Sequence, residues 1–355
     1  MDILELYRRN KSSRRLIKGV KKNYARLPYD RSLTANQEKE IKQYFHDLVK
    51  VDVPVDWHRY FYRRTGVYSV KYIPTSLYYN DIIGRVNQMK FERAYSDKNL
   101  TDSLLSGVKM PVTVVKNMNG HYYIDGRLVS KAEALERCWE IDNVIIKPSL
   151  EKHGDGVCKF SCKGGVTSLD GEKIDQLFES YGPNFIVQQV VRQHKDMGTL
   201  NPSSVNTIRI LTYHSADEVL VPYSVVRIGR KGYDIDNETA GGISTKINPD
   251  GTLGKYAYGS PGNDMIELTD TGVRLEGYQI PSFAQAVELV KKLHLQLPHF
   301  DLIGWDICID EQGDPVLIEW NVWPELSQSA NGPAFGDYTE RILKEIWNRP
   351  NTRYC

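Results

Sequence analysis

The sequence contains no long apolar segment and few cysteines. None of its runs approaches the roughly 18 consecutive apolar residues that a membrane-spanning helix needs. The N-terminal stretch MDILELYRRNKSSRR lacks the apolar region and the small-residue cleavage site of a secretory signal. The five cysteines are odd in number and scattered, which is typical of a reducing compartment. We therefore expect a soluble cytoplasmic protein.

An overall excess of charge of one sign is also absent. The chain has 46 Lys and Arg against 45 Asp and Glu, so we expect no general nucleic-acid binding. The exception lies between Tyr7 and Arg26, where the sequence has basic residues and no acid. These basic residues are Arg8, Arg9, Lys11, Arg14, Arg15, Lys18, Lys21, Lys22 and Arg26. Apolar residues interleave with them, which indicates a basic amphipathic helix over residues 1–26. It could contact an anionic membrane or an acidic substrate, or simply cover the core as a solvated helix.

The pattern of apolar residues predicts an α+β protein. With 355 residues and 41% apolar content, the chain can bury cores for two or three subdomains. Capping boxes at Thr34, Ser130 and Ser282 predict three helices, and a further helix is expected from about residue 96 to Gly107. Residues 52–93, rich in Tyr, Arg and Pro, are predicted to be irregular. Apolar runs at 143–148 and 157–162 predict a strand pair, another strand follows at 184–191, and the second half is rich in strands.

The stretch GWDICIDEQGDPVLIEWN, residues 304–321, places charged residues among strand-forming ones. A hairpin whose turn is centred on the Gln-Gly pair of EQGD would set Asp306 directly opposite Glu319. Asn321, two residues further, would share their face. Opposed carboxylates repel, and a divalent cation between them would remove the repulsion. Two acids and an amide suit Mg²⁺. The alternative is a slipped register that leaves one acid in solvent.

Cationic residues precede this hairpin at positions suited to phosphate. Lys147 ends a predicted buried strand, and Gly154 and Gly156 follow in a loop whose backbone amides could approach phosphate oxygens. Lys98 lies in the first turn of a predicted helix, where the helix dipole favours anions. Arg209 projects from a predicted strand in VNTIRILTY.

Together these elements resemble the sugar-transfer-associated branch of the ATP-grasp superfamily. The motifs that carry the resemblance are DKN at 97–99, KPS at 147–149 with its glycine loop, SVNTIR at 204–209, GG at 241–242 and GWD to EWN at 304–321. The resemblance covers roughly residues 35–347. It implies an ATP-grasp fold, in which two α+β subdomains with mixed or antiparallel sheets hold ATP between them. The implied regions are a helical N-terminal region at 1–95 and subdomains at 96–191 and 192–349.

The resemblance also implies which residues hold the nucleotide. The residues that would bind the phosphates are Lys98, Lys147, Ser149 and the lid loop with Gly154 and Gly156. The adenine edge would meet the backbone of Gln188, Gln189 and Val191. His194 stands where related enzymes often have an acidic or polar ribose contact. The remaining nucleotide-binding candidates are Asn206, Asn237, Gly241 and Gly242, of which Asn237 and the glycines would border the γ-phosphate and the acceptor.

The implied catalytic chemistry needs cations and metal more than a strong base. Arg209 would stabilise the transferring phosphoryl group, and Lys246 would assist it. Asp306, Glu319 and Asn321 would bind one or two Mg²⁺ ions.

The expected function is that of an ATP-dependent carboxylate–amine ligase that forms an amide through an acyl phosphate. The resemblance favours a role in polysaccharide or sugar-conjugate biosynthesis. The substrates would be a uronic acid or another sugar-linked carboxylate and an amino acid or other amine. One alternative is a kinase that phosphorylates a sugar-type hydroxyl and needs a positioned base. Another is a non-catalytic nucleotide-binding module.

Overall fold

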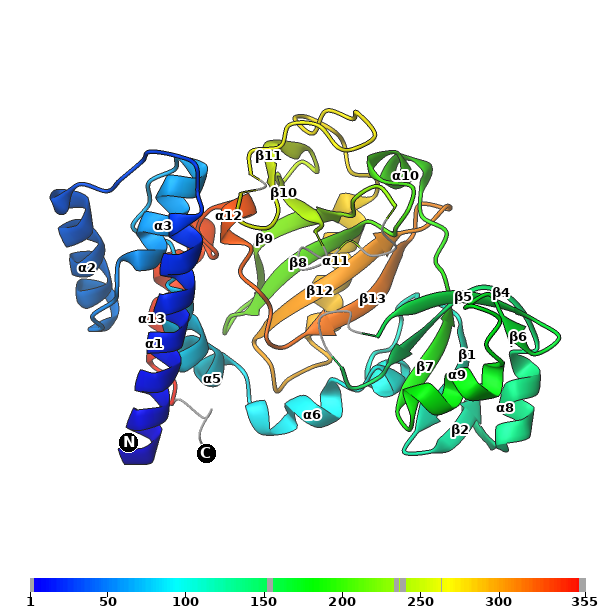
Figure 1. The fold of residues 1–355 in the computed structure, drawn as a ribbon. Coiled ribbons are helices and arrows are strands. Elements are labelled where there is room, and N and C mark those ends of the chain that lie inside the picture. The colour runs from blue at the N-terminus through cyan, green and yellow to red at the C-terminus, as the bar shows by residue number, and fades with distance from the viewer. Residues whose placement is uncertain (1–2, 152–155, 233–235, 237–240, 263, 351–355) are drawn as a thin grey trace.

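The chain forms two antiparallel sheets that lie side by side, with a bundle of helices against the second (Figure 1). The computed structural model describes residues 3–151, 156–232, 236, 241–262 and 264–350, and only the backbone of residues 3–9. We call the part built around the first sheet the small lobe and the part built around the second sheet the large lobe.

The small lobe contains a seven-stranded sheet in the order β3-β2-β1-β7-β4-β5-β6. Its strands are β1 (Thr113–Met118), β2 (His121–Ile124), β3 (Arg127–Val129), β4 (Glu140–Pro148), β5 (Cys158–Lys163), β6 (Val166–Thr167) and β7 (Phe185–Gln189). Helices α8 (Lys131–Arg137) and α9 (Ile174–Tyr181) cover one face, and their core includes Phe160, Phe178 and Phe185. The predicted capping box at Ser130 begins α8, and the predicted pairing of 143–148 with 157–162 is that of β4 with β5.

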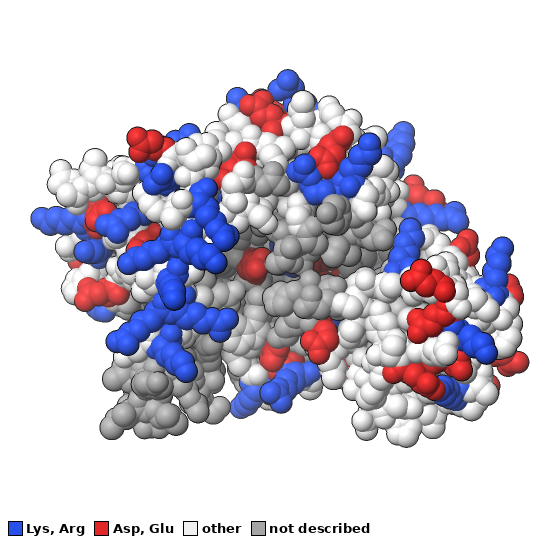
Figure 2. Space-filling model, in the orientation of Figure 1, with Lys and Arg blue, Asp and Glu red and all other residues white. Residues whose placement is uncertain are grey.

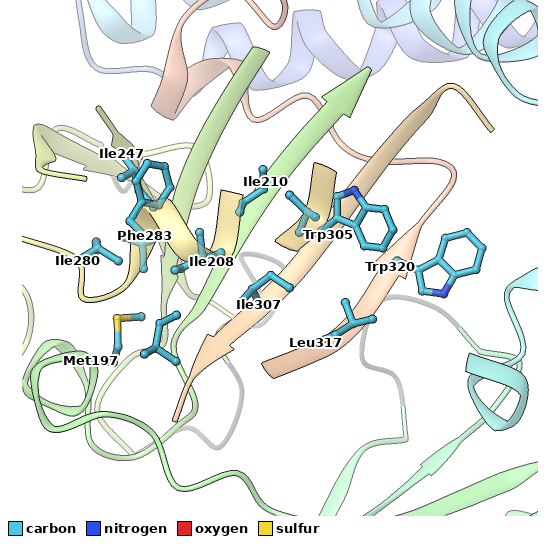
Figure 3. Close-up of a cluster of buried hydrophobic side chains, with 14 of the residues drawn as sticks. Met197, Ile208, Ile210, Ile247, Ile280, Phe283, Trp305, Ile307, Leu317 and Trp320 are labelled. Carbon is cyan, nitrogen blue, oxygen red and sulfur yellow. The ribbon is translucent and has the colours of Figure 1, made fainter. Parts of the chain in front are cut away.

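The large lobe contains a six-stranded sheet in the order β11-β10-β9-β8-β12-β13. Its strands are β8 (Thr207–His214), β9 (Val219–Ile228), β10 (Ile243–Ile247), β11 (Leu253–Tyr258), β12 (Leu302–Ile309) and β13 (Pro315–Asn321). Helix α11 (Phe283–His294) covers one face, and α10 (Lys195–Leu200) lies at the start of the lobe. Alternate strand residues such as Ile208, Trp305 and Ile307 point into this core, which Figure 3 shows.

Helices from both ends of the chain cover part of the other face of this sheet (Figure 1). The longer N-terminal helices are α1 (Ile3–Ala25), α2 (Ala35–Val49) and α3 (Asp56–Thr65). Short elements follow: α4 (Thr75–Leu77), the π-helical turn η1 (Tyr78–Ile82), α5 (Ile83–Val86), η2 (Met89–Phe91), α6 (Glu92–Tyr95), η3 (Lys98–Leu100) and α7 (Thr101–Leu104). The C-terminal elements are α12 (Gln328–Asn331), η5 (Gly336–Tyr338) and α13 (Thr339–Trp347). A shared core joins Phe45 and Ile82 to Tyr213 and Phe335.

Three local predictions need correction. Residues 52–93 are largely helical rather than irregular, because burial of residues such as Ile73 and Ile82 in the shared core stabilises short helices. The helix expected from residue 96 to Gly107 is shorter and consists of η3 and α7. Ser282 does precede α11, but in a left-handed conformation, and its hydroxyl donates to the carbonyl of Gly313 instead of capping the helix.

Helix α1 is present, as the basic amphipathic pattern predicts. Its apolar side packs through Val20, Leu16 and Tyr24 onto the aromatic residues of α3. In the part of the chain that the structure describes, no helix combines the length and apolar character needed to cross a bilayer.

Candidate active site

A row of residues in register crosses the large-lobe sheet. Glu319 on β13 pairs with Asp306 on β12, and Asp306 pairs with Arg209 on β8. The row continues through Val225 on β9 to Lys246 on β10. Directly paired residues in adjacent strands share one face of a sheet, so this row presents two acids and a guanidinium side by side.

The register at Asp306 and Glu319 is the one that the hairpin argument predicts, but the turn differs. Next to the turn, Ile307 pairs with Leu317 and Ile309 with Pro315, which centres the turn on Gln312 rather than between Gln312 and its neighbour. An irregularity between Asp306 and Ile307 shifts the register by one residue before the site. A β-bulge of this kind cannot be read from a symmetric-turn argument.

Asp306 is held by a guanidinium rather than left to face Glu319 alone. The Arg209 Nε and Nη2 groups donate to its two oxygens at 2.6 and 2.7 Å, and Arg227 Nη1 lies 3.6 Å away. Burial raises the pKa of Asp306, but Arg209 and Arg227 lower it more, and the pKa lies below its usual value. The protein itself therefore offsets the repulsion between the acids. Each carboxylate oxygen keeps a second lone pair, so a metal can bind Asp306 with Arg209 in place.

Glu319 and Asn321 complete the oxygen-rich group. The Asn321 amide donates to Glu319 Oε1 at 3.4 Å, and both side chains are half-buried. Among the described residues, no three His, Cys, Asp or Glu side chains form a metal cluster on their own. A site of two acids and one amide leaves further positions to water and phosphate oxygens, which is how Mg²⁺ is commonly bound. The donor set therefore fits Mg²⁺.

The glycine of GWD has a steric role that the motif alone does not reveal. A Cβ atom at Gly304 would lie 2.7 Å from Pro324 Cβ and 3.3 Å from Arg209 Cδ. Only a residue without a side chain lets Arg209 and the segment after β13 pack against β12 together.

The small lobe contains buried polar groups that have no partner among the described residues. Lys147 is 5% exposed, and its ammonium has no hydrogen-bond partner among the described residues. Burial lowers its pKa to about 8, although Glu319 opposes the shift. Ser149 Oγ and Gln188 Oε1 are buried without a partner among the described residues. Buried polar groups are normally paired, so these atoms fit a bound anion with hydrogen-bonding groups, such as a nucleotide.

Lys98 lies beside the end of β4. Its backbone amide donates to the carbonyl of Ser149, and its ammonium donates to the carbonyl of Glu151. Asp97 caps η3 by accepting from the backbone amide of Asn99. These contacts hold the DKN and KPS motifs next to each other.

Three cavities adjoin these residues. The hinge cavity has a volume of about 570 Å³ and is lined by Lys147, Gln189, Val191, Arg209 and Asp306 among others, with Ile145, Val157, Leu169 and Ile318 as apolar walls. The aromatic cavity, about 680 Å³, is lined by Tyr79, Tyr123, Trp320 and Trp323 and shares Lys98, Lys147, Glu319 and Asn321 with the first. The tyrosine cavity, about 220 Å³, lies beside Tyr78, Tyr79 and Tyr258. The first two lie within the size range of ordinary ligand pockets.

Several predicted site residues lie outside these cavities. His194 is the N-cap of α10 and accepts from the Asp196 backbone amide at 3.2 Å. The Asn206 amide donates to the carbonyls of Met197 and Asn201, which ties α10 to β8. Lys246 lies two strands beyond Arg209.

The predicted glycines are only partly described. Gly156 has a φ of +71°, and a Cβ there would lie 3.0 Å from Pro148 Cγ, so a side chain would be strained. Gly241 has a φ of +98°, and Gly242 begins the approach to β10. Gly154 and Asn237 lie outside the described residues.

Two residues of the hinge cavity were missed by the sequence reasoning. Arg227 lines the cavity near Asp306, and an Arg within the apolar run VVRIG is the same signal that pointed to Arg209. Asp236 also lines it and accepts from the backbone amide and hydroxyl of Thr207. Burial raises the pKa of Asp236 to about 6, against the lowering effect of Arg227.

Comparisons with known proteins identify the family of the chain. The profile of the sugar-transfer associated ATP-grasp family matches residues 78–343. No curated protein matches the chain significantly. Among solved structures, the ATP-grasp ligase PsnB, complexed with a minimal precursor, is 13% identical with a TM-score of 0.40, over 73% of this chain and 62% of that one. The D-Ala:D-Ser ligase VanG from Enterococcus faecalis is 13% identical with a TM-score of 0.41, over 71% and 61%.

An L-amino acid ligase from Bacillus licheniformis is 14% identical with a TM-score of 0.38, over 75% of this chain and 50% of that one. The chain thus spans between half and two thirds of the length of these three structures. The family profile covers well over half of the chain. The chain therefore belongs to the sugar-transfer associated ATP-grasp family, and its two antiparallel sheets form an ATP-grasp fold.

Proposed function

We propose that the chain is an ATP-dependent carboxylate–amine ligase. One observation carries the proposal: the buried ammonium of Lys147 lies across the hinge cavity from the Asp306, Glu319 and Asn321 oxygens. A cation on one lobe and a magnesium-type oxygen set on the other suit a metal-bound triphosphate between them.

Each lobe would hold one part of the nucleotide. The apolar walls at Ile145 and Ile318 would enclose the adenine, and the main chain at Gln189–Val191 would meet its edge. Lys147 and Ser149 would bind phosphate oxygens. Asp306, Glu319 and Asn321 would hold Mg²⁺, which neutralises charge on the phosphates when bound. Arg209, oriented by Asp306, would stabilise the charge that develops on the transferring phosphoryl group.

The proposed reaction balances without a strong protein base. A substrate carboxylate oxygen bonds to the γ-phosphorus as the bond to ADP breaks, which gives an acyl phosphate. The amine nitrogen then bonds to the acyl carbon, phosphate leaves with the electron pair, and the nitrogen loses a proton to water. Nucleophile and leaving group are both good, so positioning and charge neutralisation carry the catalysis.

The arrangement of cavities supports a three-substrate reaction. The hinge, aromatic and tyrosine cavities all include Glu325 in their walls. The aromatic cavity combines Tyr79, Tyr123 and Trp323 with the carboxylates of Asp102 and Asp125, a mixture that suits the apolar faces and hydroxyls of a sugar. We therefore propose a uronic acid or sugar-linked carboxylate as the acid, an amino acid or similar amine as the second substrate, and a role in polysaccharide or sugar-conjugate biosynthesis.

The test is the substrate dependence of ADP release. Purified protein with Mg²⁺-ATP is incubated with uronic acids, with amino acids and with both together, and ADP and products are followed by coupled assay and mass spectrometry. The ligase proposal expects ADP release and an amide only when acid and amine are both present. ADP release with a lone sugar alcohol, yielding a phosphate ester, would refute it.

One observation favours a kinase as the second candidate. A kinase needs a base beside the acceptor hydroxyl, and Asp236 lines the hinge cavity with a pKa raised to about 6 by burial. In that case Asp236→Asn removes the acid limb of the pH–rate profile and lowers the rate on a sugar hydroxyl by 100-fold or more, a magnitude typical of general base catalysis. For the ligase, the same substitution changes the rate little.

We also propose that α1 contacts an anionic membrane surface. Its apolar side faces the protein, while Lys11, Arg14, Arg15, Lys18 and Lys22 are exposed, and Figure 2 shows Lys and Arg gathered along this helix. Binding would then be electrostatic, without insertion. The variant Arg14→Glu/Lys18→Glu/Lys22→Glu is expected to lose sedimentation with phosphatidylserine vesicles at low salt. Equal sedimentation of this variant and the unmodified protein would refute the idea.

A further inference from the structure

The tyrosine cavity is small and is lined mainly by aromatic and polar side chains. It lies between α3, the segment of α4 and η1, β11 and residues 325–330. Its aromatic walls are Phe61, Tyr78, Tyr79 and Tyr258, and its hydroxyl and amide groups come from Thr75, Ser327, Gln328 and Ser329. Glu325 is the one acid among the described lining residues, and no Lys, Arg or His is among them. Such a lining disfavours an anion and favours a cation.

The walls of this cavity are held by hydrogen bonds that do not involve a ligand. The Tyr78 hydroxyl donates to the Pro324 carbonyl at 2.7 Å, and the Tyr223 hydroxyl donates to the Glu325 carbonyl at 2.5 Å. Gln328 bonds both the amide and the carbonyl of Ile73. The cavity is therefore preformed, which lowers the entropic cost of binding.

Arg64 lies behind one wall, with its guanidinium 5.5 Å from the centre of the Tyr258 ring. Its charge is already matched, because its Nε donates to Asp264 Oδ1 at 2.5 Å. The guanidinium also donates to Ser329 Oγ, which fixes that lining residue. Arg64 therefore supports the wall while its partner compensates its charge.

Glu325 connects this cavity to the site of phosphoryl transfer. It lines the hinge, aromatic and tyrosine cavities, is exposed, and forms no ion pair with a described residue. It follows Asn321 closely in sequence, and its neighbour Pro324 packs over Gly304 next to Arg209. A group bound at Glu325 would thus lie beside the phosphate end of the hinge cavity.

We propose that the tyrosine cavity binds the amine substrate as an ammonium, with Glu325 as its ion-pair partner and the tyrosine rings as cation–π walls. The ammonium gives one proton to water before its nitrogen, now neutral, attacks the acyl carbon, and the second proton leaves after the bond has formed. This rests on the proposed ligase function. The volume of about 220 Å³ lies below the usual range for drug-sized ligands, so the amine is small, of the size of an amino acid or short alkylamine rather than a peptide or glycan. The aromatic cavity is left for the acid.

The test is direct binding without turnover. Propylamine, charged at pH 7, is titrated against the full-length protein by saturation-transfer NMR, beside propan-1-ol and propionate as uncharged and anionic analogues of equal length. We expect propylamine to bind and the other two to fail to displace it. Glu325→Gln is expected to weaken propylamine binding about tenfold, because it removes a charge-assisted contact. Tyr79→Leu is expected to weaken it less, by removing one cation–π face.

The matched control is Glu311→Gln, an exposed glutamate on the β12–β13 turn, which should bind propylamine like the unmodified protein. Thermal melting establishes that each variant is folded.

The proposal is overturned if propylamine does not bind, if propionate competes with it, or if Glu325→Gln binds it normally. The assay uses no ATP, so its result does not depend on whether the protein is a ligase. Acid-and-amine-dependent ADP release without ammonium binding would reject this cavity alone, and ammonium binding without such release would reject the ligase alone.

Discussion

The two lobes differ in how completely their sheets are covered. The large-lobe sheet has α11 on one face and helices from both chain ends on part of the other (Figure 1). The paired residues from Glu319 to Lys246, which we call the charged row, cross this sheet. The small-lobe sheet has α8 and α9 on one face, and Lys147 and Gln188 project from the other towards the large lobe. In the large lobe Asp306 is therefore paired with Arg209, whereas Lys147 in the small lobe has no ion-pair partner among the described residues.

This difference matches what the two halves of a metal–nucleotide site require. Mg²⁺ demands near-ideal octahedral geometry, and its candidate ligands lie on strands packed from both sides. Adenine and phosphate oxygens tolerate more variation in contact geometry, and their candidate ligands lie at strand ends of the thinner lobe. Removal of the Asp306 charge and removal of the Lys147 charge should therefore have opposite effects on stability.

The largest effect is expected from Glu319→Ala. Glu319 has no resolved internal ion pair among the described residues, so the fold should persist, while loss of a metal ligand should lower ADP release about 1,000-fold. The measurement is a coupled ADP assay with Mg²⁺ varied, and circular dichroism checks the fold. Glu311→Ala serves as the control with unchanged activity. A Glu319→Ala variant with more than a tenth of normal activity would contradict the assignment.

Asp306→Ala should destabilise the protein as well as inactivate it. Arg209 would stay buried without its partner, at a cost of about 3–5 kcal/mol in the free energy of unfolding. Urea denaturation measures the change. The double variant Asp306→Leu/Arg209→Met should regain most of the stability and none of the activity, because a buried pair can be replaced by apolar groups. If Asp306→Ala unfolds at the same urea concentration as the unmodified protein, the ion pair does not stabilise the lobe.

Lys147→Met, in the small lobe, should not destabilise the protein as Asp306→Ala does. Without ligand, the substitution removes a buried charge that has no described partner, so stability should stay equal or rise. ATP affinity should fall by about 10- to 100-fold, as expected for one charge-assisted hydrogen bond. Equilibrium binding of a fluorescent ATP analogue and urea denaturation test the two halves of this expectation. A loss of stability without ligand would show that Lys147 is paired within the fold.

The same lysine should make nucleotide affinity depend on pH. Burial lowers the pKa of Lys147 to about 8, so in the free protein its positive charge is present below pH 8 and lost as pH rises through that value. Affinity for ATP should fall by about tenfold per pH unit above 8 until the pKa of the bound state is reached. Lys147→Arg should flatten this limb, since Arg remains protonated. A steep limb that persists in the Arg variant would assign it to another group.

The sequence was sufficient to predict that Asp306 and Glu319 are paired on adjacent strands. Alternation in GWDIC and LIEWN and one turn sufficed to pair Asp306 with Glu319, although the actual turn and bulge differ from the reasoning. It could not reveal that Arg209 binds Asp306, because that contact joins residues 97 positions apart through strand order. Repulsion between the two acids therefore does not by itself require a metal, because Arg209 already pairs with Asp306.

Local signals also failed where tertiary contacts decide. Residues 52–93 contain prolines and tyrosines that disfavour regular helix, yet the core shared with Tyr213 and Phe335 makes them helical. Sequence motifs also did not reveal that the Asn206 side chain donates to α10 and that His194 caps this helix, while their predicted nucleotide contacts stay predictions. The proposed subdomain boundary between residues 191 and 192 falls in the segment that joins β7 to α10. No sequence pattern marks Glu325 as a site residue. Only its position in the walls of three cavities indicates it.

The smallest effect is expected at Lys246, at the end of the charged row. Two strand spacings, about 10 Å, separate its backbone from that of Arg209, so its ammonium acts on the phosphoryl group mainly at a distance. Lys246→Met should lower kcat by less than about tenfold, and the loss should shrink in high salt, where long-range charge effects are screened. Steady-state assays at low and high salt measure this. A loss of 1,000-fold, independent of salt, would mean that Lys246 touches the reacting atoms.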